Sequence, residues 1–278
     1  MDAGLVYSVR LMMTTELGNP TPAFIPAVQA IAWREWVRFF RQRSRVIGAF
    51  ATPVIFWVLL GFGADRVFSD PGSSGAGIGY SAYFFPGALV MILLFTAIFS
   101  TITVIDDRNE GFLQGVLVSP APRSAIVLGK VIGGAGIAMV QALAFLALYP
   151  LVVGWPGISA MLALLPAMAV LTVALTGLGL VMAWRMDSTA GYHAMMNILL
   201  MPMWFLSGAV FPASSAPVWM KAVMAINPLT YGHQVVSGLL LGDDAPAGLV
   251  PMWAAVLIVA GFAAAMVGWA TRLANRPA

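Results

Sequence analysis

Long apolar runs, separated by short charged stretches, occupy most of this chain. Because a charge at the centre of a bilayer costs roughly 3 kcal/mol or more, a membrane span can be bounded by reading from one charge to the next. Four such intervals each hold one helix of about 20 residues, and the charge-free run from Lys130 to Arg185 holds two, joined at Gly154-Trp155-Pro156-Gly157. The pattern predicts an all-α integral membrane protein with six transmembrane helices, at residues 46–63, 83–104, 126–153, 159–184, 192–211 and 249–270.

Composition agrees with this interpretation. Hydrophobic residues make up 60% of the 278 positions and charged residues only 9%, and the mean hydropathy is +0.91. Soluble domains carry about 25% charged residues, so lipid is the expected solvent for most of this chain. The lack of cysteine excludes disulfides and thiolate metal sites.

Basic residues collect in alternate loops. They precede the first predicted span and follow the second, fourth and sixth: Arg34, Arg38, Arg41, Arg43 and Arg45, then Arg108, Arg123 and Lys130, then Arg185, then Arg272 and Arg276. Only Arg66 and Lys221 fall in the other loops. Since Lys and Arg mark the cytoplasmic face, both termini are expected in the cytoplasm. The net charge of +3 arises in these loops, so nucleic-acid binding is not predicted.

The N-terminal part divides into an irregular segment, 1–25, and an amphipathic helix, 26–45. In the helix, arginines recur at three- and four-residue steps along one face and apolar residues along another: Arg34, Arg38, Arg41 and Arg45, against Trp33, Val37 and Phe40. We expect this helix to lie in the cytoplasmic interface, with its arginines toward phosphates or a partner. The alternative is a plain positive-inside anchor for the first span.

A polar island, residues 106–120, follows the second predicted span. Four ionisable residues stand within five positions, at Asp106, Asp107, Arg108 and Glu110. We expect them outside the lipid, on a cytoplasmic helix of about residues 107–118 that has one acidic and one apolar stripe. Such a helix could transmit a push from a docked partner into both neighbouring spans. The alternative is a solvated loop with a surface helix.

The outer segment 212–248 is broken by prolines and glycines into short apolar pieces. Residues 217–226 and 229–241 are too short to cross a bilayer. They are therefore predicted to be short re-entrant or surface-lying helices between spans five and six.

The chain lacks the chemistry of an enzyme. Its two histidines, His193 at the inner interface and His233 at the outer surface, fall on opposite sides of the predicted membrane. With no His-Glu-x-x-His pattern and no paired intramembrane acids, neither catalytic nor metal-binding residues are predicted. No ionisable residue lies near a span centre, which argues against proton coupling, and Lys130 is expected to extend to the interface.

Nucleotide binding is not expected either. Neither lysine stands in a Gly-x-x-x-x-Gly-Lys-Ser/Thr setting, so any ATPase that drives this protein is a separate polypeptide. The chain itself is expected to need no cofactor.

Small residues mark expected helix contacts. Gly129-x-x-x-Gly133 with Gly136, and Gly261-x-x-x-Ala265 with Gly268, allow close approach of helices. Packing within one subunit and a dimer face are both compatible with these patterns.

Two sequence motifs resemble a known family. Asn109 to Pro120, read as Asn-Glu-Gly-Phe-Leu-Gln-Gly-Val-Leu-Val-Ser-Pro, resembles the cytoplasmic signature of ABC-2 type permeases. The run Phe205-Leu206-Ser207-Gly208-Ala209-Val210-Phe211-Pro212, followed by Asn227-Pro228-Leu229-Thr230-Tyr231, looks like the family's signature around the fifth span. The resemblance covers roughly residues 26–272, with 46–272 as the six-span permease domain, and is nearest to the drug-resistance and nodulation-factor exporter branch.

This resemblance implies the permease subunit of an ATP-driven exporter in the cytoplasmic (inner) membrane of a prokaryote. It implies a complex of two permease copies, in the simplest case a homodimer, with two ABC ATPase subunits that bind the ATP and Mg²⁺. The residues expected to couple the permease to the ATPase are Asp107, Arg108, Glu110, Phe112, Leu113, Gln114, Arg34, Arg38 and Arg41.

The cargo path is expected along the permease dimer interface. By position, its candidate residues are Phe84, Phe85, Phe95, Phe99, Met201, Trp204 and Phe205. Aromatic and methionine side chains suit an amphiphilic, lipid-like or polyketide-like cargo, and they are also ordinary packing residues of a helix bundle. The exporter is expected to move an amphiphilic, lipid-like, drug-like or glycan cargo. An ATPase-independent channel or secondary transporter, and a membrane scaffold without transport, are the alternatives to the exporter.

Overall fold

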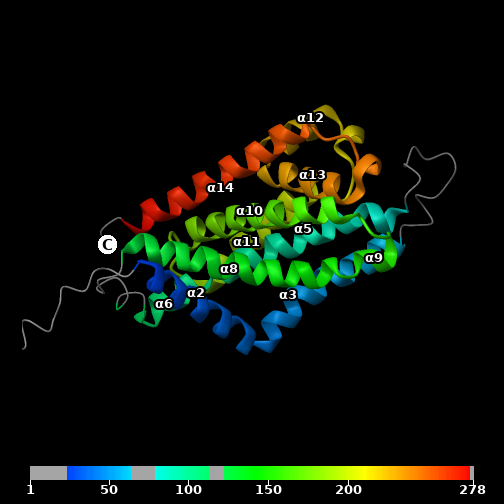
Figure 1. The fold of residues 1–278 in the computed structure, drawn as a ribbon. Helices are drawn as coiled ribbons and strands as arrows, with labels where there is room; N and C mark the ends of the chain where they lie inside the picture. Colours follow the sequence, from blue (N-terminus) through cyan, green and yellow to red (C-terminus); the bar gives the residue numbers. More distant parts are fainter. Residues whose placement is uncertain (1–23, 64–78, 113–114, 116–121, 276–278) are drawn as a thin grey trace, which may run out of the picture.

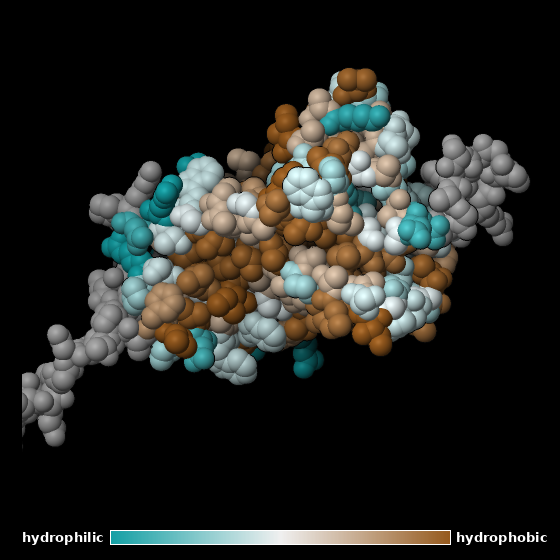
Figure 2. All heavy atoms as spheres, turned by 45° about the horizontal axis from the view of Figure 1, so that its top comes forward, coloured by the Kyte–Doolittle hydropathy of each residue, from teal (hydrophilic) through white to brown (hydrophobic). Residues whose placement is uncertain are grey.

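Helices make up nearly all of the chain that the computed structural model describes, which is residues 24–63, 79–112, 115 and 122–275. No strand occurs among these residues, which confirms the all-α prediction for them. Most of the long helices run side by side, with α2, α6 and the C-terminal end of α14 at one end of the bundle and α9 at the other (Figure 1). On the face shown in Figure 2, the surface between the two ends is mostly apolar.

Within the described residues, four helices are long and apolar enough to cross a membrane. They are Tyr80–Asn109 (α5, Tyr80–Ser100, with α6, Thr103–Asn109), Arg123–Val152 (α8, Arg123–Leu146, with α9, Tyr149–Val152), α10 (Ile158–Ala183) and α14 (Met252–Ala274). These match the predicted spans 83–104, 126–153, 159–184 and 249–270. The α5 helix is the central one, since 89% of its most apolar window is buried, against 28% for α14.

The N-terminal helices form a bent pair. The first helix, α2 (Phe24–Arg41), ends before Gln42, and the chain continues into α3 (Arg43–Phe56) and the π-helical segment η1 (Trp57–Phe62). The two arms meet at 84°. If this bent pair is taken as one span, the number of candidate spans among the described residues rises to five. A sharp turn between an amphipathic and an apolar helix fits a helix on the membrane surface that leads into a span.

The predicted fifth span, 192–211, is interrupted. The α11 helix (Thr189–Trp204) is 16 residues long and contains Pro202, and it passes into the π-helical segment η2 (Phe205–Ala209). Within η2, Gly208 has a φ of +93°, a backbone conformation that disfavours any side chain. The segment is therefore not one continuous α-helix.

Side chains from other elements satisfy the carbonyl groups that this break leaves free. Met203 O accepts from Asn227 Nδ2 at 2.6 Å, Leu206 O from Thr230 Oγ1 at 3.2 Å, Gly208 O from the Tyr83 hydroxyl at 2.9 Å and Val210 O from the Tyr80 hydroxyl at 2.9 Å. Irregular backbone survives at membrane depth only with such partners. The two halves of the second sequence motif are thus joined by hydrogen bonds that stabilise a broken helix.

The outer segment forms two short helices, α12 (Val218–Ile226) and α13 (Pro228–Leu241), separated by Asn227. One expectation for this segment is wrong. His233 of α13 is only 4% exposed, although it was expected at the outer surface. The reason is that α13 packs back against α5, α10 and α14, so its residues lie inside the bundle.

Candidate functional site

A cluster of charged side chains joins α2, α6 and α8 at the end of the bundle where α2 begins. Asp107 of α6 is its centre and has no exposed surface. Arg34 donates two hydrogen bonds to the Asp107 carboxylate, at 2.7 and 3.0 Å, and Arg38 donates a third at 2.8 Å. Lys130 of α8 donates the fourth at 2.7 Å. Both carboxylate oxygens are therefore fully occupied by cationic donors from two other helices.

A second acid, Glu35 of α2, completes the cluster. Its Oε1 accepts from Lys130 Nζ at 2.8 Å, and its Oε2 accepts from the Thr103 hydroxyl at 2.8 Å. Glu35 is 3% exposed and Lys130 is 5% exposed. Buried charges are costly unless they are paired and hydrogen-bonded, and every charged group here is both. The cluster therefore stabilises one relative placement of the three helices.

Glycines on α8 bring α2 close enough for these pairs to form. A Cβ at Gly129 would lie 2.7 Å from Cβ of Ile31, and one at Gly133 would lie 2.9 Å from Cβ of Glu35. One at Gly136 would lie 2.8 Å from the Trp36 ring. The first small-residue pattern is thus a contact within one subunit. At Gly261 and Gly268 of α14, by contrast, nothing lies within 4 Å of such a Cβ among the described residues.

Two expectations about this region are wrong. Lys130 does not extend to the interface, because its ammonium group is buried between two carboxylates. The helix expected at about 107–118 is not continuous, because α6 ends at Asn109 and Gly111 has a φ of +75°. Beyond Gly111, Gly115 N donates to Gly111 O at 3.3 Å.

The residues expected to couple the permease to an ATPase are thus in different environments. Asp107, Arg34 and Arg38 contact one another inside the protein. Glu110 is at the edge, with 60% of its side chain exposed and 3.4 Å from Arg38. Phe112 is 40% exposed, and its ring centroid lies 3.7 Å from the Arg34 guanidinium. Among these five residues, Glu110 and Phe112 have the most exposed side chains.

Two members of that set are elsewhere. Arg108 donates to the backbone oxygens of Trp184 and Met186, at 3.2 and 3.3 Å, and so caps the C-terminal end of α10. Arg41 is exposed at the end of α2. The remaining two, Leu113 and Gln114, lie outside the described residues.

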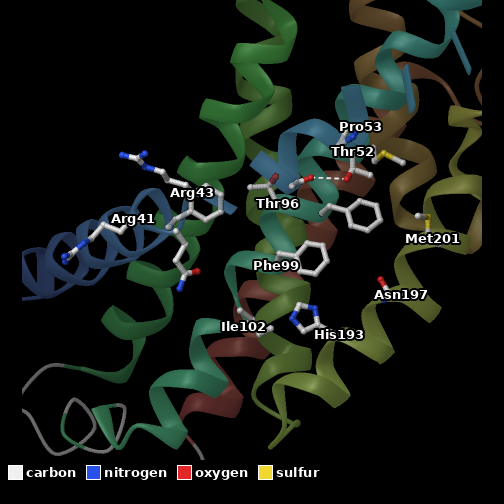
Figure 3. Close-up of a pocket in the computed structure, with 15 residues that line it drawn as sticks. Arg41, Arg43, Thr52, Pro53, Thr96, Phe99, Ile102, His193, Asn197 and Met201 are labelled. Atoms are coloured by element: carbon white, nitrogen blue, oxygen red, sulfur yellow. Dashed lines mark hydrogen bonds between the residues drawn. The ribbon is translucent and has the colours of Figure 1, made fainter. Parts of the chain in front are cut away.

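A cavity of about 1110 Å³ lies between the α2–α3 corner, α5 and α11 (Figure 3). It contains three of the expected path residues, Phe95, Phe99 and Met201. The rings of Phe95 and Phe99 stack at 5.8 Å, and the His193 ring continues this row at 5.6 Å from Phe99. The full lining is Phe39, Arg41, Gln42, Arg43, Gly48, Thr52, Pro53, Met91, Phe95, Thr96, Phe99, Ile102, His193, Asn197 and Met201.

The other expected path residues do not line this cavity. Phe84, Phe85 and Trp204 are fully buried in the core of the subunit, where Trp204 Nε1 donates to Gly87 O at 2.9 Å. Phe205 is 39% exposed and also lies outside the cavity lining. Several lining residues had no sequence signal, among them Asn197 and Thr52, because only the fold brings α3 and α11 to opposite sides of one space.

The described residues hold no group of three or more histidine, aspartate or glutamate side chains that could bind a metal ion. The molecule is a multi-pass helical membrane protein with a buried charge cluster at one end and an amphipathic cavity beside it.

Sequence comparison assigns its family. The ABC-2 type transporter family matches residues 26–241, and the chain belongs to that family. This confirms the predicted resemblance and makes the protein a transporter permease.

Individual relatives agree. The chain is 27% identical over 223 residues to Nodulation protein J of Rhizobium leguminosarum bv. viciae, covering 77% of this chain and 79% of that protein. It is 25% identical over 211 residues to the putative transport permease ycf38 of Cyanophora paradoxa, covering 75% and 72%. It is 26% identical over 165 residues to the probable multidrug ABC transporter permease YbhR of Escherichia coli strain K12, covering 59% and 45%.

Proposed function

We propose that this chain is the membrane-spanning subunit of an ATP-driven exporter, which moves an amphiphilic cargo outward across the cytoplasmic membrane. Membership of the ABC-2 type transporter family supports this proposal. Energy comes from a separate ATPase, because the sequence has no P-loop of its own. The working assembly has two permease copies and two ATPase subunits.

The proposed topology has six spans and cytoplasmic termini. The first span is α3 with η1 and the fifth is α11 with η2, in addition to the four long helices. The arginines of α2, with Arg108, Arg123 and Arg185, then lie on the cytoplasmic side.

The observation that carries the mechanism is the buried contact of Asp107 with α2 and α8. Because Arg34, Arg38 and Lys130 all bind this one carboxylate, α2, α6 and α8 move as a unit. The ATPase contacts the exposed edge of this unit, at Glu110 and Phe112. The buried pairs then transmit the movement of the ATPase into α5, which leads into α6, and into α8, which carries Lys130 of the cluster.

Cargo follows the cavity beside this unit. Phe95 and Phe99 are on α5, the helix that leads directly into α6. A displacement of α6 therefore changes the width of the cavity, which couples ATP hydrolysis to cargo release.

The test is the double variant Glu110→Ala with Leu113→Asp, produced together with the ATPase partner. Glu110 is exposed, so its loss should leave the buried cluster intact. We expect ATP hydrolysis to continue while ATP-dependent export in inside-out vesicles falls strongly. Asp243→Ala, at an exposed acid in the outer segment, is the matched control and should export normally.

Two results would contradict the proposal. Unchanged export in the double variant would remove the coupling role of this edge. A wild-type permease that fails to co-purify with any ATPase, and that moves cargo in liposomes without one, would instead identify a channel or secondary transporter.

A further inference from the structure

We propose that the cavity between the α2–α3 corner, α5 and α11 selects amphiphiles with an anionic headgroup. This inference rests on the proposed function only in taking the occupant to be the exported cargo. Its basis is the sign of the charges around the cavity and their position relative to the aromatic wall.

The charged residues that line the cavity in the described part of the chain are both positive. Arg41 and Arg43 contribute to the lining, and none of the described aspartates or glutamates does. Among the described residues neither arginine has a carboxylate partner, whereas Arg34 and Arg38, on the same helix as Arg41, are bound to Asp107. A guanidinium group presents several donors in a planar fork that matches phosphate, sulfate or carboxylate oxygens. The free cations thus favour an anion and repel a cationic headgroup.

The arginines lie at the margin of the cavity rather than among its rings. In Figure 3 their side chains extend from the α2–α3 corner away from Phe99 and His193. Both residues are exposed. This places an anionic group at the mouth, where water and lipid headgroups can also reach it, and leaves the interior for an apolar tail.

The interior suits such a tail. Phe95 and Phe99 form a stacked wall, and Met91 and Met201 add flexible apolar surface. The cavity volume of about 1110 Å³ is slightly larger than the usual range of ligand pockets, which is about 300–1,000 Å³. A chain of a dozen or so carbons fits within it. The side chains of His193 and Asn197 provide no negative charge that could bind a cationic cargo.

The test compares two probes that share a tail and differ in charge. Dodecyl phosphate and dodecyltrimethylammonium, both radiolabelled, are bound to purified permease in phosphatidylcholine nanodiscs, and binding to empty nanodiscs is subtracted. We expect tighter binding of the anionic probe. In the double variant Arg41→Gln with Arg43→Gln, its affinity should fall by about 5- to 30-fold, since each surface arginine near the headgroup level contributes about 1 kcal/mol. Binding of the cationic probe should stay equal or improve.

Two further variants test whether the difference in binding arises in this cavity. Arg272→Gln removes an exposed arginine near the end of α14, outside the cavity lining, and should leave both affinities unchanged. Phe99→Ala should weaken both probes, because the tail is common to them. Equal binding of the two probes, an unaltered anionic affinity in the double variant, or no binding of either because a second copy of the chain covers the cavity, would each overturn the inference. The assay contains no ATPase, so its failure leaves ATP-driven export of another cargo standing.

Discussion

Replacing Lys130 by methionine tests the buried charge cluster. Methionine keeps most of the apolar length of lysine and removes the ammonium group. Glu35 then loses its 2.8 Å partner and keeps the Thr103 hydroxyl, while Asp107 keeps three hydrogen bonds from two arginines. The free-energy cost therefore falls mainly on Glu35, which is 3% exposed and has its next cation, Arg34, 3.8 Å away.

Breaking a buried pair by removing one partner costs about 3–5 kcal/mol. We expect Lys130→Met to lower the free energy of unfolding by an amount in this range. The assay is reversible unfolding by dodecyl sulfate in mixed micelles, followed by the fluorescence of the 9 tryptophans. Lys221→Met is the matched control, because it removes the only other lysine, which has no ion pair among the described residues; its cost should be within about 0.5 kcal/mol.

A double variant distinguishes the loss of the Lys130–Glu35 ion pair from a loss of packing around residue 130. With Glu35→Gln added, no unpaired carboxylate remains beside the methionine, so the two changes should cost about 1–3 kcal/mol less than their sum. Equal stability of the Lys130→Met and Lys221→Met proteins, or strict additivity of the two changes, would refute the arrangement of charges described above.

The same unfolding assay checks three further predictions. Gly133→Ala should lower the free energy of unfolding by about 1–3 kcal/mol, because its Cβ would lie 2.9 Å from Cβ of Glu35. Gly261→Ala meets no neighbour among the described residues and should be neutral or slightly stabilising. Similar costs for the two variants would contradict the close approach of α2 to α8. Tyr192→Phe should cost about 1–2 kcal/mol, because its hydroxyl lies 2.6 Å from a buried threonine hydroxyl that would be left without it, and no measurable cost would argue against that contact. Phe84→Ala should cost about 3–5 kcal/mol and Phe99→Ala clearly less, since Phe84 has no exposed surface and Phe99 borders a cavity. A larger cost for Phe99→Ala than for Phe84→Ala would contradict the assignment of Phe84 to the core and Phe99 to the cavity wall.

Charge spacing in the sequence predicted the straight helices well and the interrupted ones poorly. The spans at α5, α8, α10 and α14 are single apolar helices whose limits follow from the nearest charges. The break after α11 depends on hydrogen bonds from Asn227 and Thr230, which are more than 15 residues away in the chain. Periodicity within one segment contains no information about such partners.

The burial of the charge cluster could not be predicted from the sequence either. Hydropathy treats every charge as a surface group, so Lys130 and Asp107 were expected in contact with water or a partner protein. Their burial results from the glycines of α8, which let α2 approach closely enough for its arginines to reach Asp107. The glycine pattern was visible in the sequence, but the helix it would contact was not.

The cargo-path residues illustrate the same point. Phe84 lies on nearly the same face of α5 as Phe95, about three turns earlier. At its level Trp204 covers that face, with the two ring centroids 5.9 Å apart, whereas Phe95 and Phe99 face the cavity. Spacing along a helix predicts the direction of a side chain and leaves open which neighbour it meets there.

In the proposed mechanism, an ATPase docks on the exposed edge of the α2–α6–α8 unit, next to the end of α6. This docking is tested most directly by site-specific photocrosslinking, which is simple here because the chain has no cysteine. A benzophenone maleimide is attached at Asn109→Cys, an exposed position at the end of α6, and at Trp219→Cys, an exposed position on α12, in an assembly that retains ATP-dependent export. We expect irradiation to capture the ATPase from residue 109 and not from residue 219. Capture from residue 219 alone, or none from residue 109 while ATP-dependent export continues, would contradict it.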